Sequence, residues 1–136
     1  MEKQLLKNIE LLQNNLIEQI VGHIINANKL NAPEERKRAD RMALFLDTLN
    51  IIVKKNDKNL LFDYANEIYA KIQEYNENQE MNKEEKKSYE YNFADYQYIL
   101  ISILNLFPNQ KTTPITNGFD KVLSKNVIEK INTFKN

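Results

Sequence analysis

Apolar residues recur every three or four positions along most of this chain of 136 residues. Such spacing gathers side chains on one face of an α-helix, whereas a half-buried strand needs a period of two. Glycine and proline, the residues that most often interrupt helices, number only two and three. The sequence therefore predicts an all-α protein. Its length suits a single domain, residues 1–136, with a core of its own.

Interruptions of this periodicity divide the chain into five predicted helices. They are a long N-terminal helix of about 29 residues carrying Leu5 to Ala27, a second from Pro33 to Lys55, a third after the turn Asn56-Asp57, a fourth from Asn82 to Phe107, and a fifth opened by Asn117 and Asp120. A loop with two prolines, 108–116, precedes the fifth helix. Because short links favour antiparallel neighbours, we expect a compact antiparallel bundle, with the tyrosine-rich fourth helix at its centre and the fifth packed on it.

Two details of the first two helices can be compared directly with a structure. Asn31 and Glu34 have capping-box spacing, with Pro33 in the first turn, so Asn31 is predicted to cap the second helix. The first helix exceeds its neighbours in length, so Met1 to Leu12 is expected to protrude, or the helix to bend near Gly22. Leu5, Ile9, Leu12 and Leu16 have the spacing of a short coiled-coil seam, which makes a homodimer an alternative to a core stripe.

Composition excludes several classes of function. The chain has no cysteine and one histidine, so we expect no metal site and no cofactor. No nucleophile stands in a recognisable catalytic motif, and the glycines needed for a phosphate-binding loop are missing, so we expect no enzyme. No apolar run is long enough to span a membrane, and the first residues do not resemble a secretory signal. We therefore predict a cytoplasmic protein without membrane contact.

Two groups of residues are the predicted contacts with a partner protein. The fourth helix has two apolar stripes: Tyr89, Phe93, Tyr96, Leu100, Ile103 and Phe107 form the first, and Tyr91, Ala94, Tyr98 and Ile101 the second. A helix that is apolar on two sides must bury both or offer one to a partner. All three arginines lie between positions 36 and 41, and their planar side chains suit carboxylates. The predicted partner contacts are Arg36, Arg38, Arg41, Tyr89, Tyr91 and Tyr98.

An alternative hypothesis places a small molecule or cofactor inside the helices. His23, Tyr96 and Asp95 would line that pocket, and Asp95 could accept a tyrosine hydroxyl or pair with Arg38. Arg41, Phe45 and Leu46, followed by the turn Asn56-Asp57 and by Leu60-Leu61, resemble helical input domains of bacterial stress regulators. That resemblance covers generic helix–turn–helix spacing and implies no particular site residues.

The sequence thus favours a small non-enzymatic regulatory protein that binds another protein, of the adaptor, immunity or inhibitor type. The abundance of Asn, Lys and Ile suggests an AT-rich bacterium or its mobile elements. A ligand-holding sensory domain is the alternative. Nucleic-acid binding ranks third, because nineteen basic side chains are balanced by nineteen acidic ones and phosphate binding usually requires a basic excess.

Overall fold

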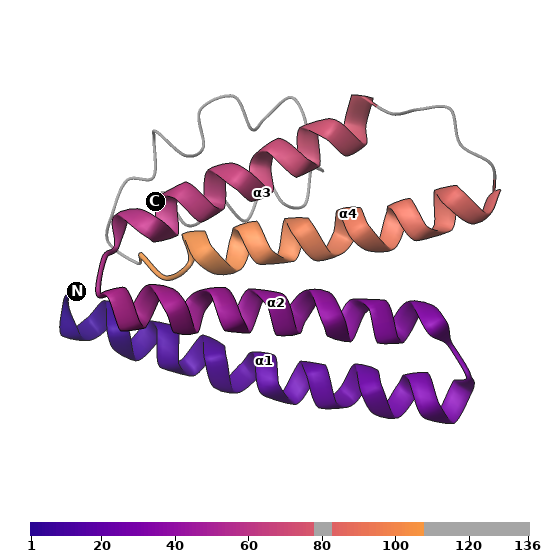
Figure 1. The fold of residues 1–136 in the computed structure, drawn as a ribbon, viewed down its shortest axis with the longest axis horizontal. Coiled ribbons are helices and arrows are strands. Elements are labelled where there is room, and N and C mark those ends of the chain that lie inside the picture. The colour runs from indigo at the N-terminus through magenta and orange to yellow at the C-terminus, as the bar shows by residue number, and fades with distance from the viewer. Residues whose placement is uncertain (78–82, 108–136) are drawn as a thin grey trace. The chain divides into compact units, whose positions relative to one another are not determined.

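The computed structural model describes residues 1–77 and 83–107, in which all regular secondary structure is helical (Figure 1). The described helices are α1 (Lys3–Leu30), α2 (Pro33–Lys55), α3 (Asn59–Glu77) and α4 (Lys83–Leu104). The predicted all-α class and the positions of the first four helices are confirmed. The predicted fifth helix and the loop 108–116 lie outside the described residues.

The chain divides into two compact units, Met1–Lys58 and Asn59–Asn136. In the first unit α1 packs against α2, and in the second α3 packs against α4. Each pair is antiparallel, as the course of the ribbon in Figure 1 shows. The antiparallel pairing of consecutive helices agrees with the short links between them. The joining of the two pairs in one bundle and one domain stays a prediction.

The turn between α1 and α2 differs from its prediction. Asn31 ends α1 in the left-handed conformation, with φ of 49° and ψ of 47°, and its N–H bonds to the carbonyl of Ala27. Ala32 is the N-cap of α2 and makes no side-chain cap, while Pro33 occupies the first turn. The predicted capping role of Asn31 is therefore wrong. Asparagine suits both positions, and the left-handed position that closes the preceding helix takes precedence here.

Aliphatic side chains around Phe45 and Met42 form the core of the first unit. The buried residues are Leu5, Ile9, Leu16 and Ala27 of α1 and Ala39, Met42, Phe45, Leu49 and Ile52 of α2. Leu5, Ile9 and Leu16 are therefore core residues and cannot form the exposed coiled-coil seam that their spacing allowed. The start of α1 does not protrude either, since the amino group of Met1 donates a hydrogen bond of 2.6 Å to Asn56 Oδ1 at the end of α2.

In the second unit, α3 buries Leu61, Ala65, Ile68 and Ile72, as their spacing predicts. α4 ends at Leu104, three residues before the predicted end. There the N–H groups of Leu106 and Phe107 bond to carbonyls three residues back, and these bonds tighten the chain into a turn before Pro108. The Phe107 ring stacks on Phe62 with a centroid distance of 4.9 Å, which ties this turn to α3.

The two stripes of α4 are buried to different extents. In the first stripe Leu100, Ile103 and Phe107 are buried. The second stripe lies at the border of the buried surface: Tyr91, Tyr98 and Ile101 are half-buried, and Ala94 is exposed. Neither stripe is a wholly exposed apolar face. Tyr91 and Tyr98 therefore offer a partner less exposed area than the tyrosines of a fully exposed helix face would.

Candidate functional site

The largest group of exposed aliphatic side chains in the described part of the chain lies on α1. Ile17, Val21, Ile24 and Ile25 are 49%, 50%, 37% and 55% exposed. At roughly 100° of rotation per residue, the first three lie along one line and Ile25 beside it, about a third of a turn from the buried residues of α1. We call these four residues the α1 aliphatic face. Contiguous exposed apolar surface of this kind marks interaction sites more often than isolated exposed leucines do.

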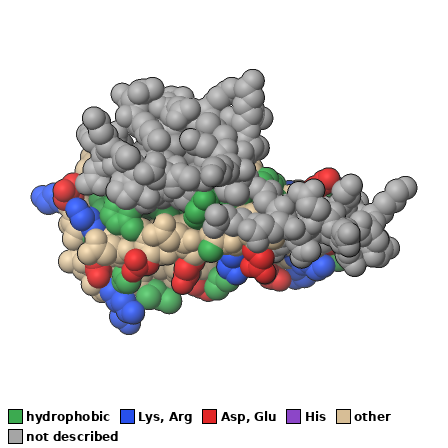
Figure 2. Space-filling view, turned by 90° about the horizontal axis from the view of Figure 1, so that it is seen from above, with side chains coloured by type: hydrophobic (Ala, Val, Ile, Leu, Met, Phe, Trp, Pro, Cys, Tyr) green, Lys and Arg blue, Asp and Glu red, His purple; other side chains and the backbone are tan. Residues whose placement is uncertain are grey.

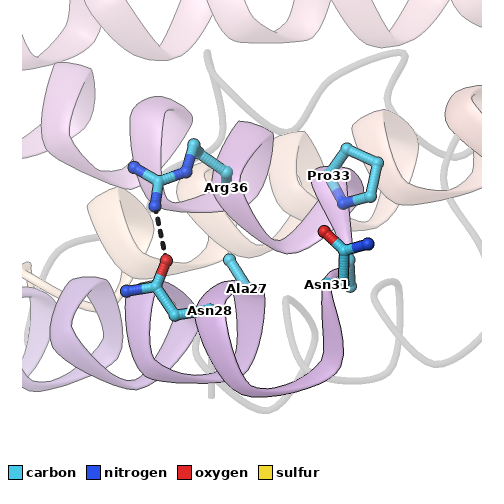
Figure 3. Close-up of a pocket in the computed structure, with 6 residues that line it drawn as sticks. Ala27, Asn28, Asn31, Pro33 and Arg36 are labelled. Carbon is cyan, nitrogen blue, oxygen red and sulfur yellow. Dashed lines mark hydrogen bonds between the residues drawn. The ribbon is translucent and has the colours of Figure 1, made fainter.

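Polar residues border the α1 aliphatic face at both ends. Glu10 and Asn14 precede it on the same line of the helix, and Asn28 follows it, all exposed. The amide of Asn28 accepts a hydrogen bond of 2.8 Å from Arg36 Nη2 on α2 (Figure 3). Arg36 therefore brings a positive charge from the first turns of α2 to the end of the α1 aliphatic face.

An open hollow of about 520 Å³ lies beside this arginine, at the turn between the two helices. It is lined by Ala27, Asn28, Asn31, Ala32, Pro33 and Arg36. In Figure 3 the Arg36 side chain reaches from α2 toward α1, while Asn31 and Pro33 lie at the other side of the hollow. A shallow, partly apolar recess with one guanidinium suits the end of a partner segment that carries a carboxylate.

The acidic residues of the first turn of α2 are engaged elsewhere. Glu35 Oε2 lies 2.5 Å from His23 Nδ1, and Glu34 Oε1 lies 3.4 Å from Lys37 Nζ. Both carboxylates are therefore paired with basic side chains other than Arg36. The His23–Glu35 pair also joins α1 to α2, with both side chains about four-fifths buried. His23 is therefore a structural link in the hairpin, whatever further role it has.

The predicted partner contacts occupy different environments. Arg36 is exposed, whereas Arg38 and Arg41 are half-buried and each makes interactions of its own. Tyr91 and Tyr98 are half-buried on α4, also with partners. The side chain of Tyr89 lies outside the described residues. Among the three predicted arginine contacts, Arg36 adjoins the α1 aliphatic face through its hydrogen bond to Asn28.

The residues of the alternative ligand pocket belong to different units. His23 lies in the first unit and pairs with Glu35, whereas Asp95 and Tyr96 lie on α4 in the second. Asp95 is 2% exposed and has interaction partners. The Tyr96 ring has the ammonium group of Lys71 at 5.8 Å from its centroid, which is a cation–π contact between α3 and α4.

The described surface carries charged side chains of both signs. On the face shown in Figure 2, acidic and basic side chains of the described residues are interspersed. Within residues 1–77 and 83–107 no three histidine or acidic side chains are grouped closely enough to hold a metal ion. Over the same residues, no helix has the length and apolarity to cross a membrane.

Comparison with protein-family models, with curated proteins and with solved structures finds no match to this chain. Sequence reasoning missed Ile17, Val21 and Ile25, because it used one apolar stripe of the first helix and left the remaining aliphatic residues unassigned. The signal was present, since the polar side of a solvated helix rarely carries three β-branched aliphatic residues within nine positions.

Proposed function

We propose that this chain is a small non-enzymatic regulatory protein of the adaptor, immunity or inhibitor type, and that it binds another protein through the α1 aliphatic face. The observation that carries the proposal is the continuous exposure of Ile17, Val21, Ile24 and Ile25 on a helix whose buried residues lie about a third of a turn away. Arg36, held at one end of this face by Asn28, supplies a directional polar contact. The main contact surface in this proposal is α1, where the sequence alone favoured the tyrosines of α4, and Arg36 is a contact in both.

The energy available from this face decides what kind of partner fits. Burying the exposed halves of four aliphatic side chains contributes on the order of 4 kcal/mol. Association costs at least about that much in lost translational and rotational freedom. The apolar contacts alone are therefore insufficient, and the partner must add polar contacts. A helix that packs its own apolar residues along α1 and brings a carboxylate to Arg36 satisfies both requirements.

Affinity capture from lysate of the native host tests the proposal. The wild-type chain is compared with Val21→Glu, which places a charge in the middle of the α1 aliphatic face. Leu44→Glu is the matched control, because Leu44 is 65% exposed on α2. Asn50 of α2 hydrogen-bonds to Gln13 of α1, and Leu44 lies about 120° around α2 from Asn50, so it is directed away from this contact with α1. We expect one nuclease-resistant protein to be captured by wild type and by Leu44→Glu but not by Val21→Glu.

Two results would contradict this function. Equal capture by Val21→Glu would move the interface away from α1, and loss of capture with nuclease would favour the nucleic-acid alternative. The ligand-holding alternative predicts instead that the purified protein carries a bound small molecule, visible as added mass under native conditions. Circular dichroism of each variant establishes that the helices are intact, so that lost capture reports on the surface.

A further inference from the structure

We propose that the α1 aliphatic face binds a second copy of this chain, with the two α1 helices packed antiparallel. This inference rests on the proposed function, because it names the partner of the same surface. Its basis is the order of residues along that surface. The order is complementary to itself when one copy is reversed, as the isologous contact of a two-fold dimer requires.

The spacing of the exposed residues fixes the register. Glu10, Asn14, Ile17, Val21, Ile24 and Asn28 follow one another at alternating steps of four and three residues, which is the heptad spacing of helices that pack along a seam. These six residues form three pairs that are symmetric in sequence about Gln19. The pairs are Ile17 with Val21, Asn14 with Ile24, and Glu10 with Asn28. A two-fold axis at Gln19 therefore places Ile17 opposite Val21 of the other copy and covers the apolar centre of both faces.

Charge distinguishes the antiparallel from the parallel arrangement. In the antiparallel register Glu10 of one copy stands opposite Asn28 of the other, to which Arg36 is hydrogen-bonded. Two exposed acid–guanidinium contacts then form, one at each end. A parallel pair would instead set Glu10 against Glu10 and Arg36 against Arg36. Like charges at matching positions would oppose association.

The same register contains two unfavourable contacts, because Asn14 of one copy stands opposite Ile24 of the other and a pair of like charges lies beside the axis. Glu18 flanks the seam one residue from the axis, so the Glu18 side chains of the two copies approach each other on the same side of the helix pair. Their repulsion opposes dimerisation, and Glu18→Gln is expected to strengthen self-association severalfold. A structural role of Glu18 within one copy would not produce this effect, because Glu18 is exposed.

Sedimentation analysis of the full chain over a wide concentration range is the first test. We expect a reversible monomer–dimer equilibrium that Val21→Glu abolishes and that Leu44→Glu leaves unchanged. Glu10→Arg and Arg36→Glu should each weaken the dimer by about tenfold or more, and the double variant should recover most of that loss. A chain that stays monomeric at the highest attainable concentration overturns this inference.

Cross-linking tests the orientation, and the absence of native cysteine makes it clean. A short bis-maleimide linker should join Glu18→Cys between copies, because the two positions adjoin the axis but flank the seam about one interhelical distance apart. Lys7→Cys should not be joined, because in the antiparallel register its two copies are roughly 36 Å apart along the helices at 1.5 Å per residue. Cross-linking through Lys7→Cys would refute the antiparallel register. A monomeric chain that still captures a different protein through Val21 would refute the dimer and leave the proposed function standing.

Discussion

Replacing Gly22 with alanine should stabilise the protein, and the structure sets the size of the gain. Gly22 lies well inside α1, eight residues before its end at Leu30. A Cβ atom built at this position has no other heavy atom within 4 Å beyond its own helix and chain neighbours, so it neither clashes nor packs. What remains is the difference in intrinsic helix preference, about 0.8–1 kcal/mol in favour of alanine.

Urea unfolding followed by far-ultraviolet circular dichroism measures this gain. The midpoint should rise while the dependence of the unfolding free energy on denaturant stays constant, because the buried surface does not change. The corresponding rise in melting temperature is about 3–5 °C for a chain of this size. Ala94→Gly is the matched control, since Ala94 is exposed in α4 and should lose a comparable amount.

The result that would refute this reasoning is a Gly22→Ala variant with unchanged or reduced stability. That outcome would mean that α1 is not a regular helix at this point and that the predicted bend near Gly22 exists. Gly22 is set roughly 100° around the helix from Val21 but lies three residues before Ile25, so it borders the α1 aliphatic face. The surface substitutions are therefore made in the wild-type chain.

Three further predictions concern the hairpin of α1 and α2. Phe45→Ala should cost about 3–5 kcal/mol of unfolding free energy because Phe45 is fully buried, and denaturant unfolding would contradict this if the loss stayed below about 1 kcal/mol. Because φ is 49° at Asn31, Asn31→Gly should be neutral or slightly stabilising, whereas Asn31→Val should cost about 1–2 kcal/mol of unfolding free energy. Equal effects of the two variants in thermal melts would argue against the left-handed turn. In a double-mutant cycle, His23→Gln and Glu35→Gln should show a coupling of about 0.5–1 kcal/mol, reduced by their partial exposure, and purely additive losses would show that the pair contributes nothing.

The described helices of this protein were predictable because apolar residues recur at helical spacing along each of them. Leu61, Ala65, Ile68 and Ile72 of α3 are spaced for a single buried face, and all four are buried. The turn at Asn56 was predictable for a similar reason, since few residues tolerate the left-handed conformation observed there, with φ of 54°. Local chemistry alone decides these features.

Features that depend on competition between positions were not predictable. Asn31 suits a helix N-cap and a left-handed turn equally well, and the sequence does not show whether it ends the first helix or begins the second. The first helix has aliphatic residues on more than one side. Periodicity gives the angle between Leu16 and Val21 but does not tell which of them another helix covers. In the structure Leu16 is buried and Val21 is exposed, and this difference defines the candidate site.

A photo-crosslinking amino acid placed at position 21, and separately at position 44, tests the central claim most directly. Both positions are exposed and apolar, and they differ in whether they belong to the α1 aliphatic face. Irradiation of host cells should give a discrete protein adduct, either a second copy or another chain, from position 21 and none from position 44. Adducts from position 44 alone, or from neither position while the α4 tyrosines cross-link, would contradict binding through α1.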